Sequence, residues 1–126
     1  MNHGHQCAGI CTWKQRGNKI IVTAGYQSYQ EITDDKYVEE FDMDKNQWYD
    51  LPKLNNKHAA YPALFTLDNI LFCIGGVDFE DKNLGDIELL DSRDSSNKWI
   101  FVDSVENYLD IPKQGGARFI CFLSFN

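Results

Sequence analysis

The sequence lacks the features that mark membrane, secreted and nucleic-acid-binding proteins. No apolar run approaches the ~20 residues that cross a bilayer, Met1–Gly9 lacks the apolar core of a signal peptide, and no Asn-x-Ser/Thr acceptor occurs. Basic residues are few: 12 Lys and Arg against 19 Asp and Glu leave a net charge of −7 over 126 residues, which repels phosphate backbones and anionic lipids. We therefore expect a protein of the cytosol or nucleus, assigned to the cytoplasm, with neither nucleic acid nor membrane as a partner.

Motifs that organise a catalytic site are also missing. Serine, histidine and aspartate are present, but there is no Gly-x-Ser-x-Gly elbow, no Gly-x-Gly-x-x-Gly run and no phosphate loop. Paired carboxylates occur at Asp34-Asp35, Glu39-Glu40 and Glu80-Asp81, and we expect all three pairs to be solvated charge. The sequence therefore predicts a chain that is not an enzyme and has no cofactor.

One cluster near the N-terminus resembles a zinc site. His3, His5 and Cys7 alternate, so a strand would place them on one face, and Cys11 follows four residues later. An extended strand would hold Cys7 and Cys11 roughly 13 Å apart, which is poor geometry for a closed site. We interpret the segment as a frayed terminus leading into the first strand, with zinc as the alternative. The four cysteines, expected to be packing thiols in a reducing compartment, are Cys7, Cys11, Cys73 and Cys121.

A second segment imitates a calcium loop. The alternating oxygens of Asp42, Asp44 and Asn46 match the opening of an EF-hand. Gln47 then occupies the position of the required glycine, and Lys53 that of the bidentate glutamate. The pattern favours a hairpin turn capped by side chains, and we predict no metal at either segment.

Short apolar runs rich in Ile, Val, Phe and Tyr alternate with clusters of Asn, Asp, Gly and Lys, which is typical of an all-β chain. A single helical turn over Ser104–Leu109 is the one exception that the capping pattern indicates. The nine predicted strands are Gln6–Thr12, Lys19–Gly25, Tyr37–Met43, Gln47–Asp50, Ala59–Thr66, Ile70–Gly76, Asp86–Asp91, Lys98–Asp103 and Ala117–Ser124.

The two halves of the chain repeat each other at a period near 50 residues. The matching segments are Ala24-Gly25 with Gly75-Gly76, Val38–Asp42 with Ile87–Asp91, and Asn46-Gln47-Trp48 with Asn97-Lys98-Trp99, at offsets of 51, 49 and 51. The small changes in offset fall between these segments, as expected when insertions are confined to turns. A unit of four strands therefore occurs twice.

This order of elements resembles the kelch repeat, the four-stranded blade of a β-propeller. The resemblance rests on Gly25, Phe41, Asp42 and Trp48 in the first unit and on Gly75, Gly76, Leu90, Asp91 and Trp99 in the second. It implies an incomplete kelch-type propeller, with a first blade at about 6–50, a second at about 59–103 and the first strand of a third at about 117–126. Two blades cannot close a ring, so completion by further blades or a homo-oligomer is expected.

Physical roles follow for the repeated residues. A glycine at a strand end permits positive φ and a close approach of neighbouring chain, so Gly75 and Gly76 are turn residues. Trp48 and Trp99 are expected to fill equivalent core positions between blades. Trp13, beside the first hairpin turn, is expected to be the more tolerant of substitution.

The resemblance implies protein–protein interaction through a propeller rim rather than catalysis. We place the long loops Tyr26–Lys36 and Val77–Gly85 on one rim and the tighter turns on the other. Aromatic and amide side chains beside acidic ones make these loops the predicted partner-binding surface, suited to a basic protein partner. Its residues are Tyr26, Gln27, Tyr29, Gln30, Asp78, Phe79, Glu80 and Asp81. The alternatives are part of a kelch-like oxidase or hydrolase with its catalytic residues on other blades, and a structural piece that completes a propeller.

Overall fold

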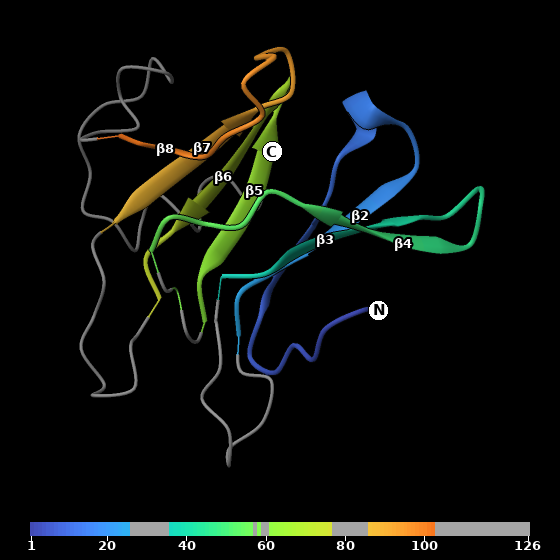
Figure 1. Ribbon diagram of the computed structural model, residues 1–126, viewed down its shortest axis with the longest axis horizontal. Helices are drawn as coiled ribbons and strands as arrows, with labels where there is room; N and C mark the ends of the chain where they lie inside the picture. The colour runs from blue at the N-terminus through green and yellow to red at the C-terminus, as the bar shows by residue number, and fades with distance from the viewer. Residues whose placement is uncertain (26–35, 57, 59–60, 77–85, 103–126) are drawn as a thin grey trace.

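The fold consists of two antiparallel sheets of four strands each (Figure 1). The computed structural model describes residues 1–25, 36–56, 58, 61–76 and 86–102. The first sheet, here called blade 1, comprises β1 (Gly9–Thr12), β2 (Lys19–Thr23), β3 (Val38–Asp42) and β4 (Gln47–Leu51). The second, blade 2, comprises β5 (Ala63–Leu67), β6 (Ile70–Ile74), β7 (Ile87–Asp91) and β8 (Ile100–Phe101). Each blade pairs its strands in chain order, as a propeller blade does.

Eight of the nine predicted strands are confirmed, and the all-β class with them. The ninth, Ala117–Ser124, and the helical turn at Ser104–Leu109 lie outside the described residues. One short 3-10 helix, η1 (Lys14–Arg16), stands where a tight turn was expected between β1 and β2. η1 is the only helix in the described ranges. It is neither long enough nor apolar enough to cross a bilayer.

Left-handed backbone ends the second strand of both blades. Gly75 and Gly76 have φ of 65° and 100°, and Ala24 and Gly25 have φ of 54° and 81°. A Cβ on Gly25 would lie 2.4 Å from the Gln6 carbonyl oxygen, so this position requires glycine for space as well as for conformation. The positive φ angles at these positions therefore explain why glycine ends the second strand in each blade.

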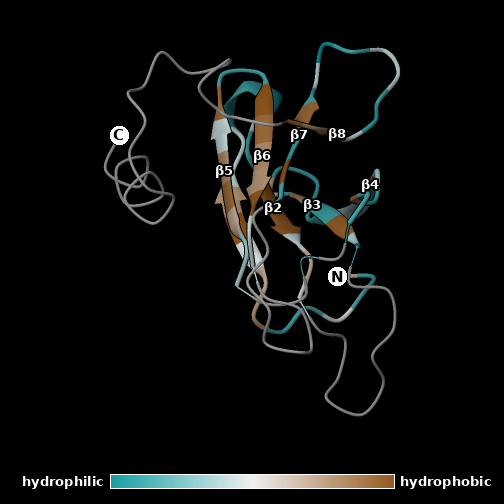
Figure 2. Cartoon of the chain, turned by 90° about the vertical axis from the view of Figure 1, so that its left-hand side faces the viewer, coloured by the Kyte–Doolittle hydropathy of each residue, from teal (hydrophilic) through white to brown (hydrophobic). Residues whose placement is uncertain are grey.

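The main core lies between the two blades. Strand alternation places Cys11, Ile21 and Val38 on the side of blade 1 that faces blade 2. Blade 2 supplies Leu64 and Leu71, with Cys73, Leu90 and Trp99 beside them. Strand β6 is apolar along its length, as Figure 2 shows, because it is covered on both faces. The two inner strands meet where Gly9 leaves room, since a Cβ there would come within 2.9 Å of the Leu64 Cβ.

The tryptophans differ from the prediction. Trp13 is fully buried between the blades, and its Nε1 donates a hydrogen bond to the Asp68 carbonyl oxygen at 3.1 Å. Trp99 is 4% exposed, but Trp48 is only partly buried. The expectation for Trp13 was wrong because the turn after β1 folds over the core between the blades. The register places Trp48 and Trp99 at equivalent positions, as predicted, but Trp48 is less buried because it lies on the face of blade 1 that points away from blade 2.

Candidate functional site

The most elaborate polar site of the described chain is a buried histidine–glutamate clamp in blade 2. His58 Nδ1 lies 2.5 Å from the Gly75 carbonyl oxygen, and its Nε2 lies 3.2 Å from Glu88 Oε1. Both side chains are 0% exposed. The same carboxylate accepts hydrogen bonds from the backbone N–H groups of Asn55 and Asn56, each at 2.8 Å. Glu88, on β7, therefore fastens the segment that connects the blades.

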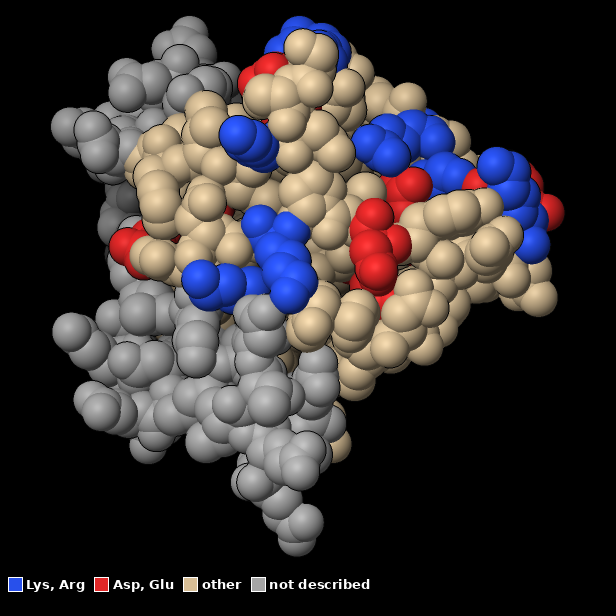
Figure 3. Space-filling model, viewed as in Figure 1, with Lys and Arg blue, Asp and Glu red and all other residues tan. Residues whose placement is uncertain are grey.

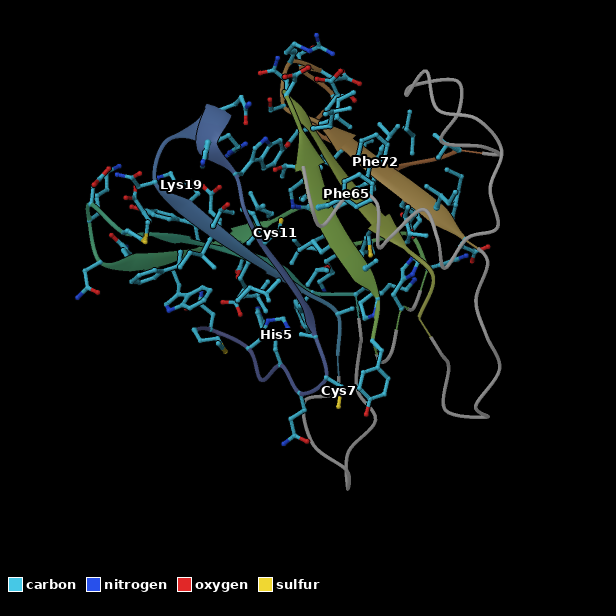
Figure 4. The ribbon with its side chains drawn as sticks, turned by 180° about the vertical axis from the view of Figure 1, so that it is seen from behind. His5, Cys7, Cys11, Lys19, Phe65 and Phe72 are labelled. Carbon is cyan, nitrogen blue, oxygen red and sulfur yellow. The ribbon has the colours of Figure 1, made fainter. Side chains whose placement is uncertain are left out.

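Blade 1 contains the same clamp, formed by the N-terminal segment. His5 Nδ1 lies 2.7 Å from the Ala24 carbonyl oxygen, and Nε2 lies 2.8 Å from Glu39 Oε2. The backbone N–H of Asn2 donates to Glu39 Oε1 at 2.6 Å, as that of Asn55 does to Glu88. His5 lies between this segment and the strands of blade 1 (Figure 4). The N-terminal segment thus occupies the position in blade 1 that the inter-blade connection occupies in blade 2.

Burial and hydrogen bonding act in opposite directions on the charges of the blade 2 clamp. Burial lowers the pKa of His58, but the bonds to Glu88 and to the Gly75 carbonyl oxygen outweigh it and leave the pKa above its ordinary value. Burial raises the pKa of Glu88, but the bonds from His58 and from the N–H groups of Asn56 and Asn55 leave it below its ordinary value. Both partners of His58 are acceptors, so the protonated ring donates at both nitrogens. The clamp is an ion pair that holds chain segments together.

Two expectations about these residues were wrong. The terminus is not frayed, because the side chain of His5 is 2% exposed and bonded at both ring nitrogens. Glu39 and Glu40 are not solvated, since they are 0% and 6% exposed. Alternation on β3 sends them to opposite faces, where the N-terminal segment covers Glu39 and Arg16 Nε pairs with Glu40 at 3.1 Å.

The candidate zinc ligands are not assembled by the fold. Within the described ranges, no group of three or more His, Cys, Asp or Glu side chains is placed to hold a metal ion. Figure 4 shows Cys7 and Cys11 in separate parts of blade 1. His3 stacks on Tyr37 with ring centroids 3.6 Å apart, and burial raises the pKa of Cys11 to about 12, which disfavours the thiolate that binds metal.

The segment that imitates a calcium loop is a capped hairpin turn, as predicted. Asp42 Oδ1 accepts hydrogen bonds from the backbone N–H groups of Asp44 at 3.0 Å and Lys45 at 3.1 Å. Lys19 pairs with the other oxygen, and this bond is the main reason that the pKa of Asp42 is lowered. Asn46 completes the turn at φ 54°. Figure 3 shows charges of both signs gathered at this tip of blade 1.

Blade 2 repeats the turn with changed details. Asp91 Oδ1 accepts from the backbone N–H of Arg93 at 2.9 Å, and Asn97 has φ 49°. The pKa of Asp91 is lowered chiefly by its side-chain bond to Arg93. The repeated aspartate and asparagine therefore shape the turn between the third and fourth strands of each blade.

The predicted rim residues lie outside the described residues. They are Tyr26, Gln27, Tyr29, Gln30, Asp78, Phe79, Glu80 and Asp81. The strand ends that flank their loops are described, and they lie at equivalent places in the two blades, after β2 and β6. The backbone N–H of Leu54, in the connection between the blades, donates to the Lys36 carbonyl oxygen at 3.0 Å, so this connection lies at the same end.

The sequence analysis missed the clamps, although a signal for them was present. Asn2-x-x-His5 and Asn55-x-x-His58 repeat at an offset of 53 residues, and the glutamates that they meet repeat at 49. These offsets differ because His5 and Glu39 are 34 positions apart in the sequence, whereas His58 and Glu88 are 30 positions apart. The repeat therefore extends to the N-terminal segment.

Comparison with known proteins agrees with the geometry. A search of curated proteins found no match. Residues 16–55 match the family model of the Kelch motif, and this stretch runs from η1 through β2, β3 and β4 to the start of the clamp segment of blade 2. Blade 2 repeats the same strand order and the same turns. Residues 16–55 therefore carry a Kelch motif, which supports a kelch-repeat assignment for the two blades.

Proposed function

We propose that the chain is a non-catalytic protein-interaction module that binds a protein partner through the loops at one rim of its blades. The observation that carries the proposal is the shared placement of its two long connections. One joins Thr23 to Val38 and the other joins Ile74 to Ile87, and both leave the same end of equivalent strands. A rigid scaffold that presents adjacent loops at one end is a common arrangement for binding.

The chemistry of these loops favours a basic partner. Tyr26 and Tyr29 offer amphipathic rings, which anchor interfaces at low entropic cost. Asp34 follows them in the first loop, and Glu80 and Asp81 lie in the second loop. A partner with lysine or arginine around an apolar centre would meet both features.

The buried polar residues support a binding role over catalysis. The buried acid–base groups His5, His58, Glu39 and Glu88 each bond to another part of the fold. We also propose a cytoplasmic location, which the unpaired thiols of Cys7, Cys11 and Cys73 support.

A comparison of two variants tests the proposal. Replacing Tyr26 and Tyr29 together by serine should leave the circular dichroism spectrum unchanged and reduce recovery of the proteins that the wild-type chain retains from a cell lysate. The control replaces Asp44 and Lys45 by alanine in the β3–β4 turn at the opposite end. Quantitative mass spectrometry of the captured proteins measures both. Equal recovery with the two variants would remove the rim from the proposal.

A further inference from the structure

A residue with left-handed backbone precedes the first strand of each blade. Cys7 has φ 57° and lies two residues before β1, and Tyr61 has φ 56° and lies two residues before β5. The backbone N–H of Tyr61 donates a hydrogen bond to the Cys7 carbonyl oxygen at 2.8 Å. The two turns are therefore equivalent in the repeat and adjacent in the fold.

The strand register places this pair of turns at the rim of the proposed function. Ala63, two residues after Tyr61, is opposite Ile74, and Ile74 is opposite Ile87. The long connection of blade 2 joins Ile74 to Ile87, so it leaves the sheet at the end where Tyr61 lies. The register of β1 with β2 gives Cys7 the same place in blade 1 (Figure 4). Tyr61 is therefore a rim residue within the described chain.

The side chain of Tyr61 does not account for its backbone conformation. Tyr61 is 71% exposed, more than any other large apolar or aromatic residue that the structure describes. Left-handed backbone disfavours a large side chain, and Pro62 further restricts the residue before it. A ring so exposed buries little apolar area that would offset this strain. Strained residues of this kind cluster at binding and active sites, where the strain belongs to the function.

The backbone around Tyr61 is braced on both sides. His58, three residues earlier, is held by its bonds to Glu88 and to the Gly75 carbonyl oxygen. Pro62, the next residue, is buried and has a fixed φ, and β5 begins directly after it. A side chain on a braced backbone loses little further freedom when it binds, so Tyr61 is well suited to anchor a partner.

The charges of the chain favour a cationic side chain as the group that Tyr61 binds. The net charge of −7 attracts basic partners. Lys36 and Lys53 also lie at this end, but they flank the third and fourth strands of blade 1 rather than the turns before the first strands. Lys53 Nζ stands 4.1 Å from the centroid of the Tyr37 ring, so this end already contains a cation over a tyrosine.

We propose that Tyr61 anchors the partner at the rim by binding an arginine side chain of a basic segment, with the guanidinium group over the tyrosine ring. Guanidinium is planar and weakly hydrated, and it stacks on aromatic faces more readily than an ammonium group does. This inference rests on the proposed function and adds to it one residue and the chemistry of the side chain that this residue binds.

Binding of short synthetic peptides to the full chain tests the contact. In these peptides serine alternates with arginine, with glutamate or with citrulline, which keeps the shape of arginine without its charge. Fluorescence anisotropy should show the tightest binding for the arginine peptide. Tyr61→Asn should weaken that binding by about threefold or more at unchanged net charge, and Tyr61→Phe, which keeps a ring, should recover most of the affinity. Met43→Asn, at an exposed apolar residue in the β3–β4 turn of the opposite end, is the matched control.

The melting temperature separates a binding role from a structural one. Tyr61→Asn should melt at the wild-type temperature or above it, because asparagine tolerates left-handed backbone. A lower melting temperature, equal binding of the arginine peptide by both chains, or no preference for arginine over citrulline would each overturn the proposal. If the variant at Tyr26 and Tyr29 loses its captured proteins while Tyr61→Asn changes nothing, the rim remains the binding surface and Tyr61 is not its anchor.

Discussion

Replacement of Trp13 gives the sharpest test of how the blades are held together. The side chain is 0% exposed, and it contacts the apolar cluster that joins both sheets. Truncation of a buried Trp to Ala costs about 3–5 kcal/mol of unfolding free energy, through lost transfer energy and the cavity left behind. The lost indole bond to the Asp68 carbonyl oxygen adds about 1 kcal/mol. A small domain has about 5–15 kcal/mol in total, so Trp13→Ala should remove a large fraction of its stability.

The comparison with Trp48 gives this test its discriminating power. Trp48 is partly exposed in the single chain, so less apolar area is lost and Trp48→Ala should cost about 1–2 kcal/mol. Guanidinium unfolding followed by far-ultraviolet circular dichroism measures both variants.

Trp13→Phe separates packing from hydrogen bonding. The phenyl ring keeps much of the buried area but cannot donate to Asp68, so its cost should lie between those of the wild type and the alanine variant. If Trp48→Ala were as destabilising as Trp13→Ala, the placement of Trp13 in the core between the blades would be refuted.

Two further predictions concern the turn glycines and the clamp. Gly25→Ala should destabilise the fold by several kcal/mol more than Gly17→Ala in thermal melts. Both glycines have positive φ, 81° and 91°, but only at Gly25 would a new Cβ meet backbone, 2.4 Å from the Gln6 carbonyl oxygen. Equal costs for the two variants would contradict this prediction. Because the pKa of His58 is raised, its bonds stabilise the fold at low pH, and this stabilisation is lost as the pH rises through that pKa. Because the pKa of Glu88 is lowered, its bonds stabilise the fold at higher pH, and this stabilisation is lost as the pH falls through that pKa. The stabilisation should therefore be greatest between pH 4.5 and pH 6.5, the ordinary pKa values of Glu and His. Denaturant titrations at several pH values should show that His58→Gln removes this maximum. A pH profile that the substitution leaves unchanged would count against the ion pair.

The strands and the repeat could be predicted from the sequence because their causes are local. Alternating apolar residues and left-handed turn positions act within a few residues, and the same pattern occurs twice. The repeat also predicted that Asp42 and Asp91 occupy matching turns, and both accept backbone N–H groups in the structure. Insertions fall outside the strands, so the register of both sheets follows the sequence alignment.

The burial of single side chains could not be predicted, because it depends on contacts between distant segments. Trp13 corresponds by register to Leu67, which is 38% exposed, so the repeat carries no signal for its burial. Glu39 and Glu40 read as charged neighbours, and only the covering by Asn2 and Arg16 explains how both are buried. Such covering is a property of the folded chain rather than of a local pattern.

The two clamps show that contacts at the start of a blade separate into a polar and an apolar part. In blade 2, the connection from blade 1 supplies Asn55 and His58 to Glu88, while the sheet of blade 1 covers Trp99 and Leu90. In blade 1, the N-terminal segment supplies the polar part to Glu39, but the apolar part remains partly exposed. The polar and apolar contacts are therefore separable: the Glu39 carboxylate is paired with the N-terminal segment although the apolar side chains on the same face of blade 1 are partly exposed. Pairing the buried carboxylate within the chain removes the cost of leaving an unpaired charge.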